Sequence, residues 1–220
     1  MNSGFRALAA LLDYPSAELL AHLGEIESAA TALDESSSGA VMPLLAHLRG
    51  SDLLDLQEAY IETFDRGRRT SLNLFEHVHG DSRDRGQAMV DLLAMYRSAG
   101  LELDTEQLPD YLPAFLEYLS LLESAAARDQ LAEIAHILQV IRAALVRRGS
   151  TYVDIFDVLL ALAGEATDSA ELDEEDDTTP AAIDAAWVDA PVNFLDAPAP
   201  CGSSRTQPQE QAIHIHRRAA

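Results

Sequence analysis

Apolar residues recur at helical spacing along most of this chain, and this pattern constrains the fold more than any other feature. In residues 51–64, for example, Leu53, Leu56, Tyr60 and Phe64 fall on one face of a helix. Apolar residues make up 48% of the sequence, but aromatic residues only 6%, so the core must be built mainly from Leu and Ala. We see no hairpin signal and no alternation of strands with helices, and the pattern therefore predicts an all-α protein.

Glycines, prolines and capping residues divide the chain into about eight to ten predicted helices. Three helix starts carry specific signals: Asp84 with Gln87, Asp110 before the Pro113 turn, and Thr151 with Asp154. The polar segment 33–39 is expected to be a loop. The expected helices, including the three with these start signals, are at residues 5–12, 16–30, 41–48, 51–64, 84–100, 112–122, 127–147 and 151–163.

The sequence changes character after Gly164. Residues 165–220 contain 12 acidic residues against 3 arginines, a net charge of −9, and residues 165–180 have almost no apolar content. Such a segment cannot bury enough apolar surface to offset the entropy lost on ordering. We expect a single helical bundle at 1–164 and an acidic, disordered linker and tail at 165–220, with a short apolar motif at 186–194.

The formal net charge of −22 limits the classes of partner. An acidic surface repels phosphate groups, so nucleic acid and anionic membranes are poor partners. Stable membrane insertion is not expected. A basic peptide is a better partner, although the charge also fits simple solubility. The first residues lack a signal-peptide cleavage pattern, no apolar run is long enough to span a membrane, and Cys201 is the single cysteine. We expect a cytoplasmic protein.

The segment EHVHGDSRDRGQAM, residues 76–89, resembles a metal or catalytic site at first sight. However, His77 and His79 are two residues apart and would face different sides of a helix, whereas zinc ligands on a helix lie one turn apart. The chain has no nucleophile elbow and no glycine-rich phosphate loop. We therefore expect no metal, no bound cofactor, no catalytic residue and no enzymatic activity.

Two irregular joints, 65–85 and 101–113, are rich in polar residues and arginines. One interpretation is that these arginines neutralise nearby acids and satisfy helix ends. The other is that the joints border a groove, lined by Leu, Met and Tyr and rimmed by acids, for a basic amphipathic helix.

Three blocks resemble a known family. YIETFDRGRRTSLNLFEHVHGDSRDRGQAMVDLLAMY (60–96) resembles the signature segment of the respiratory nitrate reductase assembly chaperones, the NarJ family or delta subunit. LPDYLPAFLEYL (108–119) is similar to the second block of that family, and AWVDAPVNF (186–194) with Cys201-Gly202 is similar to its tail motif. Tyr111 departs from the pattern, because the family usually has His at this position.

The resemblance implies the all-α fold of the redox-enzyme maturation chaperones. It also implies a cytoplasmic chaperone that binds the apo catalytic (alpha) subunit of a membrane nitrate reductase. Such a chaperone recognises the N-terminal segment of that subunit and permits molybdenum cofactor insertion. Molybdenum cofactor biosynthesis proteins are a further expected class of partner. A chaperone of the same fold for another molybdoenzyme, or a generic helical adaptor, stay open as alternatives.

Residues and resemblance together give three sets of candidate residues. The expected peptide-binding residues are Tyr60, Glu62, Phe64, Asp65, Leu74, Glu76, His77, Met89, Leu93, Tyr96, Asp110, Tyr111 and Phe115. The expected structural joint consists of His79, Gly80, Asp81, Arg83, Asp84, Arg85 and Gln87. The tail motif has the apolar anchors Trp187, Val192 and Phe194, which are expected either to dock on the chaperone itself or to contact the client.

Overall fold

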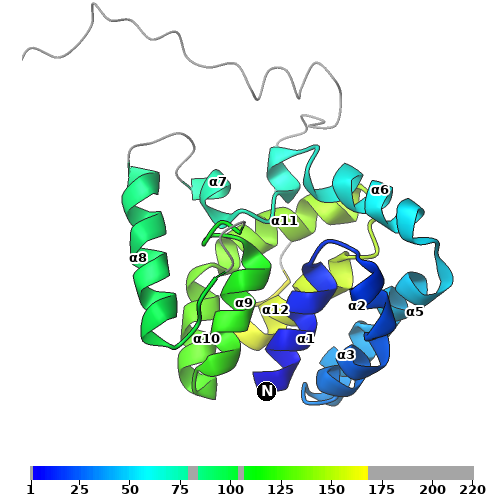
Figure 1. Ribbon diagram of the computed structural model, residues 1–220, viewed down its shortest axis with the longest axis horizontal. Coiled ribbons are helices and arrows are strands. Elements are labelled where there is room, and N and C mark those ends of the chain that lie inside the picture. Colours follow the sequence, from blue (N-terminus) through cyan, green and yellow to red (C-terminus); the bar gives the residue numbers. More distant parts are fainter. Residues whose placement is uncertain (1, 79–83, 104–106, 168–220) are drawn as a thin grey trace, which may run out of the picture. The chain divides into compact units, whose positions relative to one another are not determined.

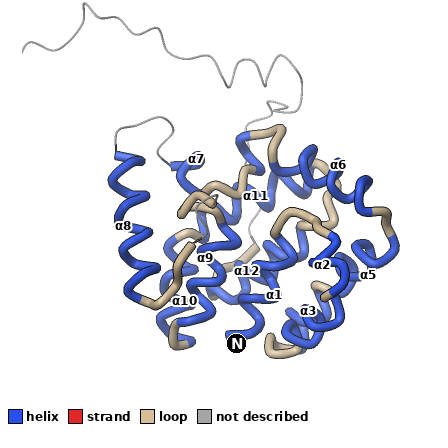
Figure 2. The backbone as a smooth tube through the Cα atoms, in the orientation of Figure 1, coloured by secondary structure: helices blue, strands red, loops and turns tan. Residues whose placement is uncertain are grey.

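The computed structural model describes residues 2–78, 84–103 and 107–167, and this part of the chain is helical (Figures 1 and 2). Within these residues the only pairing of extended backbone is an isolated antiparallel bridge between Asn73 and Tyr111. The predicted all-α fold class is therefore confirmed. The predicted tail motif and its anchors lie outside the described residues, as do residues 79–83.

The helices follow one another in the order labelled in Figure 1. Their bounds are α1 (Asn2–Leu12), α2 (Ala17–Ala21), α3 (Leu23–Ala30), α4 (Glu35–Ala40), α5 (Met42–Gly50), α6 (Leu53–Phe64), the 3-10 helix η1 (Arg68–Thr70), α7 (Leu74–Val78), α8 (Asp84–Ser98), α9 (Leu112–Leu121), α10 (Ser124–Glu133), α11 (Ala135–Arg147) and α12 (Val153–Ala163).

The core forms where α1, α9 and α12 supply apolar faces. α1 packs against α9 and α3, and α12 packs against α10 and α11. The predicted stripes supply this core: Leu116 and Leu119 of α9 and Ile155 and Phe156 of α12 are fully buried. Burying a side chain of this size contributes about 1.5–3 kcal/mol, so these stripes hold the fold together.

Two segments that the sequence predicts as single helices are each divided in two. The expected helix 16–30 breaks at His22, and the expected helix 127–147 breaks at Ile134. At Ile134 the backbone N–H bonds to the carbonyl of Leu131, three residues back, which is the tighter 3-10 pattern. This break changes the helix direction and lets both α10 and α11 pack against α12.

The prediction of a loop at 33–39 was wrong, because this segment contains α4. The Asp34 carboxylate accepts hydrogen bonds from the backbone N–H of Ser37 at 3.1 Å and from its hydroxyl at 2.7 Å. Ser37 is buried and α4 packs against α12. A run of serines has weak helix propensity, and here the N-cap and tertiary contacts override it.

The capping signals gave mixed results. Ser16 is the N-cap of α2, and its hydroxyl accepts from the Leu19 N–H at 3.1 Å. The capping box predicted at Thr151 was wrong, because Tyr152 holds the N-cap position of α12 without a side-chain bond. Gly164 ends α12 in the left-handed conformation with φ +83°, as the sequence predicts.

Candidate functional site

The two irregular joints of the sequence meet in the structure. The backbone N–H of Leu112 donates to the carbonyl of Leu72 at 2.8 Å, and the N–H of Leu74 donates to the carbonyl of Asp110 at 2.9 Å. These two bonds flank the bridge between Asn73 and Tyr111. The segment before α7 is therefore fastened to the segment before α9.

Asp110 is the centre of this joint. Its Oδ2 atom accepts from the N–H of Phe75 at 3.0 Å, so it caps the start of α7 and not the start of α9. The prediction that Asp110 caps α9 was wrong, since Tyr111 is in that position. The side chain is fully buried, and its Oδ1 atom has no hydrogen-bond partner among the described residues. Burial raises the pKa of this carboxyl group.

α8 is attached to the same joint at two points. The hydroxyl of the fully buried Tyr96 donates to the carbonyl of Pro109 at 2.8 Å. Near the other end of the helix, Arg85 Nη2 lies 3.9 Å from Asp110 Oδ2. Both contacts reach the adjacent residues 109 and 110, so the joint fixes the position of α8. Arg85, one of the predicted joint residues, is thus placed beside Asp110.

Tyr111 connects the joint to α1 and α6. Its hydroxyl donates to Asp13 Oδ1 at 3.1 Å and lies 2.9 Å from the hydroxyl of Tyr60, which donates to the carbonyl of Leu12 at 2.9 Å. Burial raises the pKa of both tyrosines, which keeps their hydroxyl protons in place as donors. Tyr111 therefore has a polar contact of its own in the position where the family usually has His.

His77 is hydrogen-bonded within the same joint. Its Nε2 atom lies 2.9 Å from the carbonyl of Ser71, and burial lowers the pKa of the ring. In the described part of the chain, no three His, Cys, Asp or Glu side chains gather in a way that could hold a metal ion. His79 lies outside that part.

Burial divides the predicted peptide-binding residues into two groups. Residues of the first group are buried in the core or in the joint, and each is at most 5% exposed: Tyr60, Phe64, Leu74, Tyr96, Asp110 and Phe115. The other seven remain partly or fully exposed: Glu62, Asp65, Glu76, His77, Met89, Leu93 and Tyr111. The first group does not line an open surface, and only the second group can contact a partner directly.

The predicted structural joint lies partly outside the described residues: His79, Gly80, Asp81 and Arg83. Asp84 is the first residue of α8. Gln87 donates its amide to Asp91 Oδ1, one turn further along α8, at 2.9 Å. In the predicted capping box, the Gln87 side chain would instead bond to the backbone at the start of α8.

The exposed candidates come from several helices. Glu62 and Asp65 are at the end of α6 and Glu76 is on α7, whereas Met89 and Leu93 are on α8. Figure 1 shows α6 and α8 well apart, with α7 between them. Burial, together with the negative charge of Glu76, raises the pKa of Asp65. Glu76 on α7 lies close enough to Asp110 to raise the pKa of that carboxyl group, and Asp110 in turn is 3.9 Å from Arg85 of α8.

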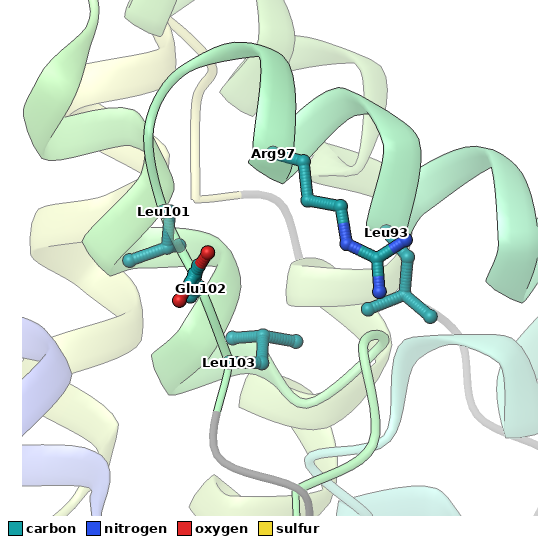
Figure 3. A pocket seen from close by; sticks show the side chains of 5 residues that line it. All are labelled: Leu93, Arg97, Leu101, Glu102 and Leu103. Atoms are coloured by element: carbon teal, nitrogen blue, oxygen red, sulfur yellow. The ribbon is translucent and has the colours of Figure 1, made fainter.

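α8 presents its apolar stripe only half covered. Met89, Leu92 and Leu93 are each partly exposed, and Leu92 also packs against the hydrophobic core. At the end of this stripe is a pocket of about 200 Å³, lined by Leu93 and Arg97 of α8 and by residues 101–103 (Figure 3). Arg97, Leu101, Glu102 and Leu103 were missed from the sequence; the helix-ending Gly100 followed by Leu-Glu-Leu was the available signal.

The described part of the chain is all-helical, and one of its helices, α8, leaves apolar side chains partly exposed. The chain matches the model of the nitrate reductase delta subunit family over residues 19–157. It therefore belongs to this family.

Several relatives have names that describe their role. The chain is 47% identical over 216 residues to the nitrate reductase molybdenum cofactor assembly chaperone NarJ of Escherichia coli K12, covering 94% of this chain and 88% of that protein. It is 43% identical to the probable chaperone NarW of the same strain, with coverages of 90% and 87%. It is 30% identical to the probable chaperone NarJ of Bacillus subtilis, with coverages of 71% and 86%.

The helices in the described ranges are too short or too polar to cross a membrane.

Proposed function

We propose that this protein is a cytoplasmic, non-enzymatic chaperone that binds the catalytic subunit of a nitrate reductase and permits insertion of the molybdenum cofactor. Three relatives have names that describe this role, and in each case the match covers most of the relative's length, which supports the proposal. The single observation on which it depends is the 47% identity over nearly the whole chain. Molybdenum cofactor biosynthesis proteins are further partners in this proposal.

The N-terminal segment of the catalytic subunit is the proposed ligand, bound as an amphipathic helix along α8. The partly exposed stripe of Met89, Leu92 and Leu93 offers the apolar contact that such a helix needs. Burying a fully exposed apolar side chain contributes about 1.5–3 kcal/mol, and these side chains, which are already partly buried, contribute part of that amount each. Apolar contacts therefore set most of the affinity.

Carboxylates on α6 and α7 supply the electrostatic part of recognition. Glu62 and Asp65 are exposed and Glu76 is partly exposed, in a chain with a net charge of −22. Each exposed ion pair contributes only about 0.2–1 kcal/mol. These acids therefore guide a basic segment toward the chaperone and raise the association rate more than they raise the affinity.

A binding titration of the isolated client segment tests the proposal. A peptide of the first few dozen residues of the catalytic subunit is titrated into the full-length protein at increasing salt concentration. Met89→Asp should weaken binding at least tenfold, because a charge then has to be buried against the apolar face of the peptide. Val90→Asp is the matched control, since Val90 is 57% exposed on the neighbouring face of the same helix.

Two outcomes would contradict parts of this proposal. Equal binding by the two variants removes α8 as the recognition surface, and an affinity that does not change with salt removes the electrostatic part. Co-purification from anaerobic cells tests the role itself. The nitrate reductase catalytic subunit should be recovered with this protein, and should lack cofactor when this protein is absent.

A further inference from the structure

We propose that the acidic segment 168–177 of this chain docks within the same molecule on four arginines of η1 and α11. These arginines, which we call the basic patch, are Arg68, Arg69, Arg147 and Arg148. The inference concerns the free protein and does not depend on the proposed client. It assigns a binding surface at η1 and at the end of α11, and one partner for that surface.

Two segments of this acidic chain contain arginines but no carboxylate. Residues 66–75 have three arginines and residues 134–150 have three more, whereas neither segment contains Asp or Glu. The whole chain has 37 acidic residues against 15 basic ones, so the two segments depart strongly from its average. Positive charge that is concentrated on an otherwise negative protein favours an anionic partner.

The fold brings these two segments together. η1 packs against α11, and Nη1 of Arg148 donates to the hydroxyl oxygen of Thr70 at 2.9 Å and to the carbonyl of Thr63 at 2.8 Å. Thr70 is fully buried, so these bonds fasten the end of α11 to η1. The other arginines of the basic patch directly precede Arg148 and Thr70 in the chain, and the patch is therefore a single surface.

The basic patch is open to solvent. Arg68 and Arg147 are exposed, and the other two arginines are partly exposed. At the border of the patch, Arg66 is 3.6 Å from Glu62 of the preceding helix. Guanidinium groups form their strongest hydrogen bonds with carboxylates and phosphates. A run of carboxylates is consequently a chemically matched ligand for this surface.

The chain leaves the described fold beside the helix that carries half of the patch. α12 ends before Gly164, and the side-chain amide of Gln139 on α11 donates to the carbonyl of Ala166 at 3.4 Å. Gln139 and Arg147 are about 12 Å apart along the axis of α11, at a rise of about 1.5 Å per residue. The acidic segment that follows Ala166 therefore starts close to the basic patch.

The acidic segment has the charge and the length to reach the basic patch. Seven of the ten residues 168–177 are acidic, and residues 173–177 are an unbroken acidic run, DEEDD. The residues from Ala166 to the start of this run reach up to about 23 Å when extended. This reach exceeds the distance of about 12 Å along α11. The run can therefore contact the patch.

The tether makes weak ion pairs sufficient for docking. An exposed ion pair contributes only about 0.2–1 kcal/mol. Here several pairs form together, and a short tether gives an effective concentration in the millimolar range. The docked segment shields the basic patch from other polyanions, such as nucleic acid or an anionic membrane surface, which the acidic remainder of the surface repels. This shielding is the proposed role of the contact.

Zero-length cross-linking tests the contact directly, because the chain contains no Lys. Arg68→Lys and Arg147→Lys each introduce one side-chain amine without changing the charge. A carbodiimide joins this amine to a carboxylate in contact with it, and mass spectrometry of the full-length monomer locates the bond. We expect bonds from both positions to residues 171–177. Their yield should fall about tenfold or more in about 1 M salt, where charges are screened beyond about 3 Å.

Two further variants control the cross-linking. Arg49→Lys should be joined to Glu27, its ion-pair partner in the structure, which verifies the chemistry. Arg128 is also exposed but lies on α10, so Arg128→Lys should not be joined to residues 171–177. The proposal is overturned if neither patch position is joined to the acidic segment, or if Arg128→Lys is joined to it equally often. It is also overturned if the bonds form only between two molecules, which mixtures of isotope-labelled and unlabelled protein reveal.

A binding titration tests the shielding role. In one full-length variant every Asp of residues 173–177 is replaced by Asn and every Glu by Gln. This variant should bind a ten-residue glutamate peptide about three- to tenfold more tightly than the wild-type protein, because the tethered competitor is lost. Equal binding by the two proteins, or no binding by either, contradicts the proposal.

A matched variant separates this effect from the general loss of negative charge. It neutralises the same number of exposed acids on the helices and should bind the peptide like the wild-type protein: Glu18, Glu25, Asp55, Glu58 and Asp129. If this variant gains as much affinity as the other, the gain comes from net charge and the docking proposal fails. Circular dichroism melting verifies that each variant is folded. Neither experiment includes the client, so the outcomes are independent of the proposed function.

Discussion

Replacing Asp110 should affect stability more than its single hydrogen bond to Phe75 suggests. Asp110→Ala removes the acceptor of the Phe75 N–H, which is a hydrogen bond to a charged group worth about 1.5–3 kcal/mol. It also leaves Arg85 without the carboxylate 3.9 Å away and opens a small cavity at a fully buried position. We expect a loss of about 2–4 kcal/mol in the free energy of unfolding.

Asp110→Asn should be much milder, at about 1 kcal/mol or less. The amide oxygen still accepts from the Phe75 N–H, while the cost of burying a charge disappears. Only the attraction to Arg85, at a distance beyond a hydrogen bond, is lost. The difference in the free energy of unfolding between the Ala and Asn variants therefore gives the contribution of the hydrogen bond and the packing, without that of the charge.

The pH dependence of stability gives an independent measure of the same residue. Burial raises the pKa of Asp110, so just above the ordinary pKa the folded state retains a proton that the unfolded state has lost. The contribution of this residue to stability is therefore greatest at low pH and falls as the pH rises through the raised value. Asp110→Asn should remove this part of the pH dependence.

Urea unfolding, followed by circular dichroism, measures these differences. Asp52→Ala is the matched control, because Asp52 caps α6 with a bond of 2.9 Å to the Leu54 N–H but is exposed to solvent. It should cost about 1 kcal/mol, the usual value for an exposed cap. The reasoning is refuted if Asp110→Ala costs no more than Asp52→Ala, or if Asp110→Asn costs as much as Asp110→Ala.

Three further substitutions test other parts of the structure by the same unfolding measurement. Tyr111→Phe removes a hydroxyl that contacts two partners and should cost about 0.5–1.5 kcal/mol; no change would show that these contacts are not formed in solution. Gly100→Ala should cost about 1 kcal/mol or more because of its φ of +83°, whereas Gly86→Ala, on α8 with open space around it, should stabilise by about 0.4–1 kcal/mol; equal effects would contradict the turn geometry. Leu116→Ala, at a fully buried site, should cost about 2–5 kcal/mol, and a value under about 1 kcal/mol would contradict its place in the core.

Much of the fold could be predicted from the sequence, because it depends on local periodicity. The stripe of α9 and that of α12 are visible from residue spacing alone, and both are buried as predicted. The break at Ile134 could not be predicted in this way. Nothing in the local sequence opposes a continuous helix there, and the change of direction follows from packing of both halves against α12.

The joint was only partly predictable, for a different reason. The sequence shows that polar residues gather at 65–85 and 101–113, but not which atoms bond to which. Asp110 is three residues before a proline, a usual position for capping the helix that follows, and yet it caps a helix that begins 36 residues earlier. The local sequence indicates that a carboxylate can cap a helix, whereas the tertiary fold determines which helix it caps.

The block that resembles the family contains two kinds of residue that sequence similarity cannot separate. Tyr60, Phe64 and Tyr96 are fixed by the core and the joint, whereas Met89 and Leu93, in the same block, remain partly exposed. Apolar residues at helical spacing look alike in both cases, because the same periodicity produces a buried stripe and a binding stripe. Burial separates the two kinds, and the residues that the fold leaves uncovered are those that can bind a partner. This reasoning moves the proposed contact from the centre of the block to α8, where Met89 and Leu93 remain partly exposed.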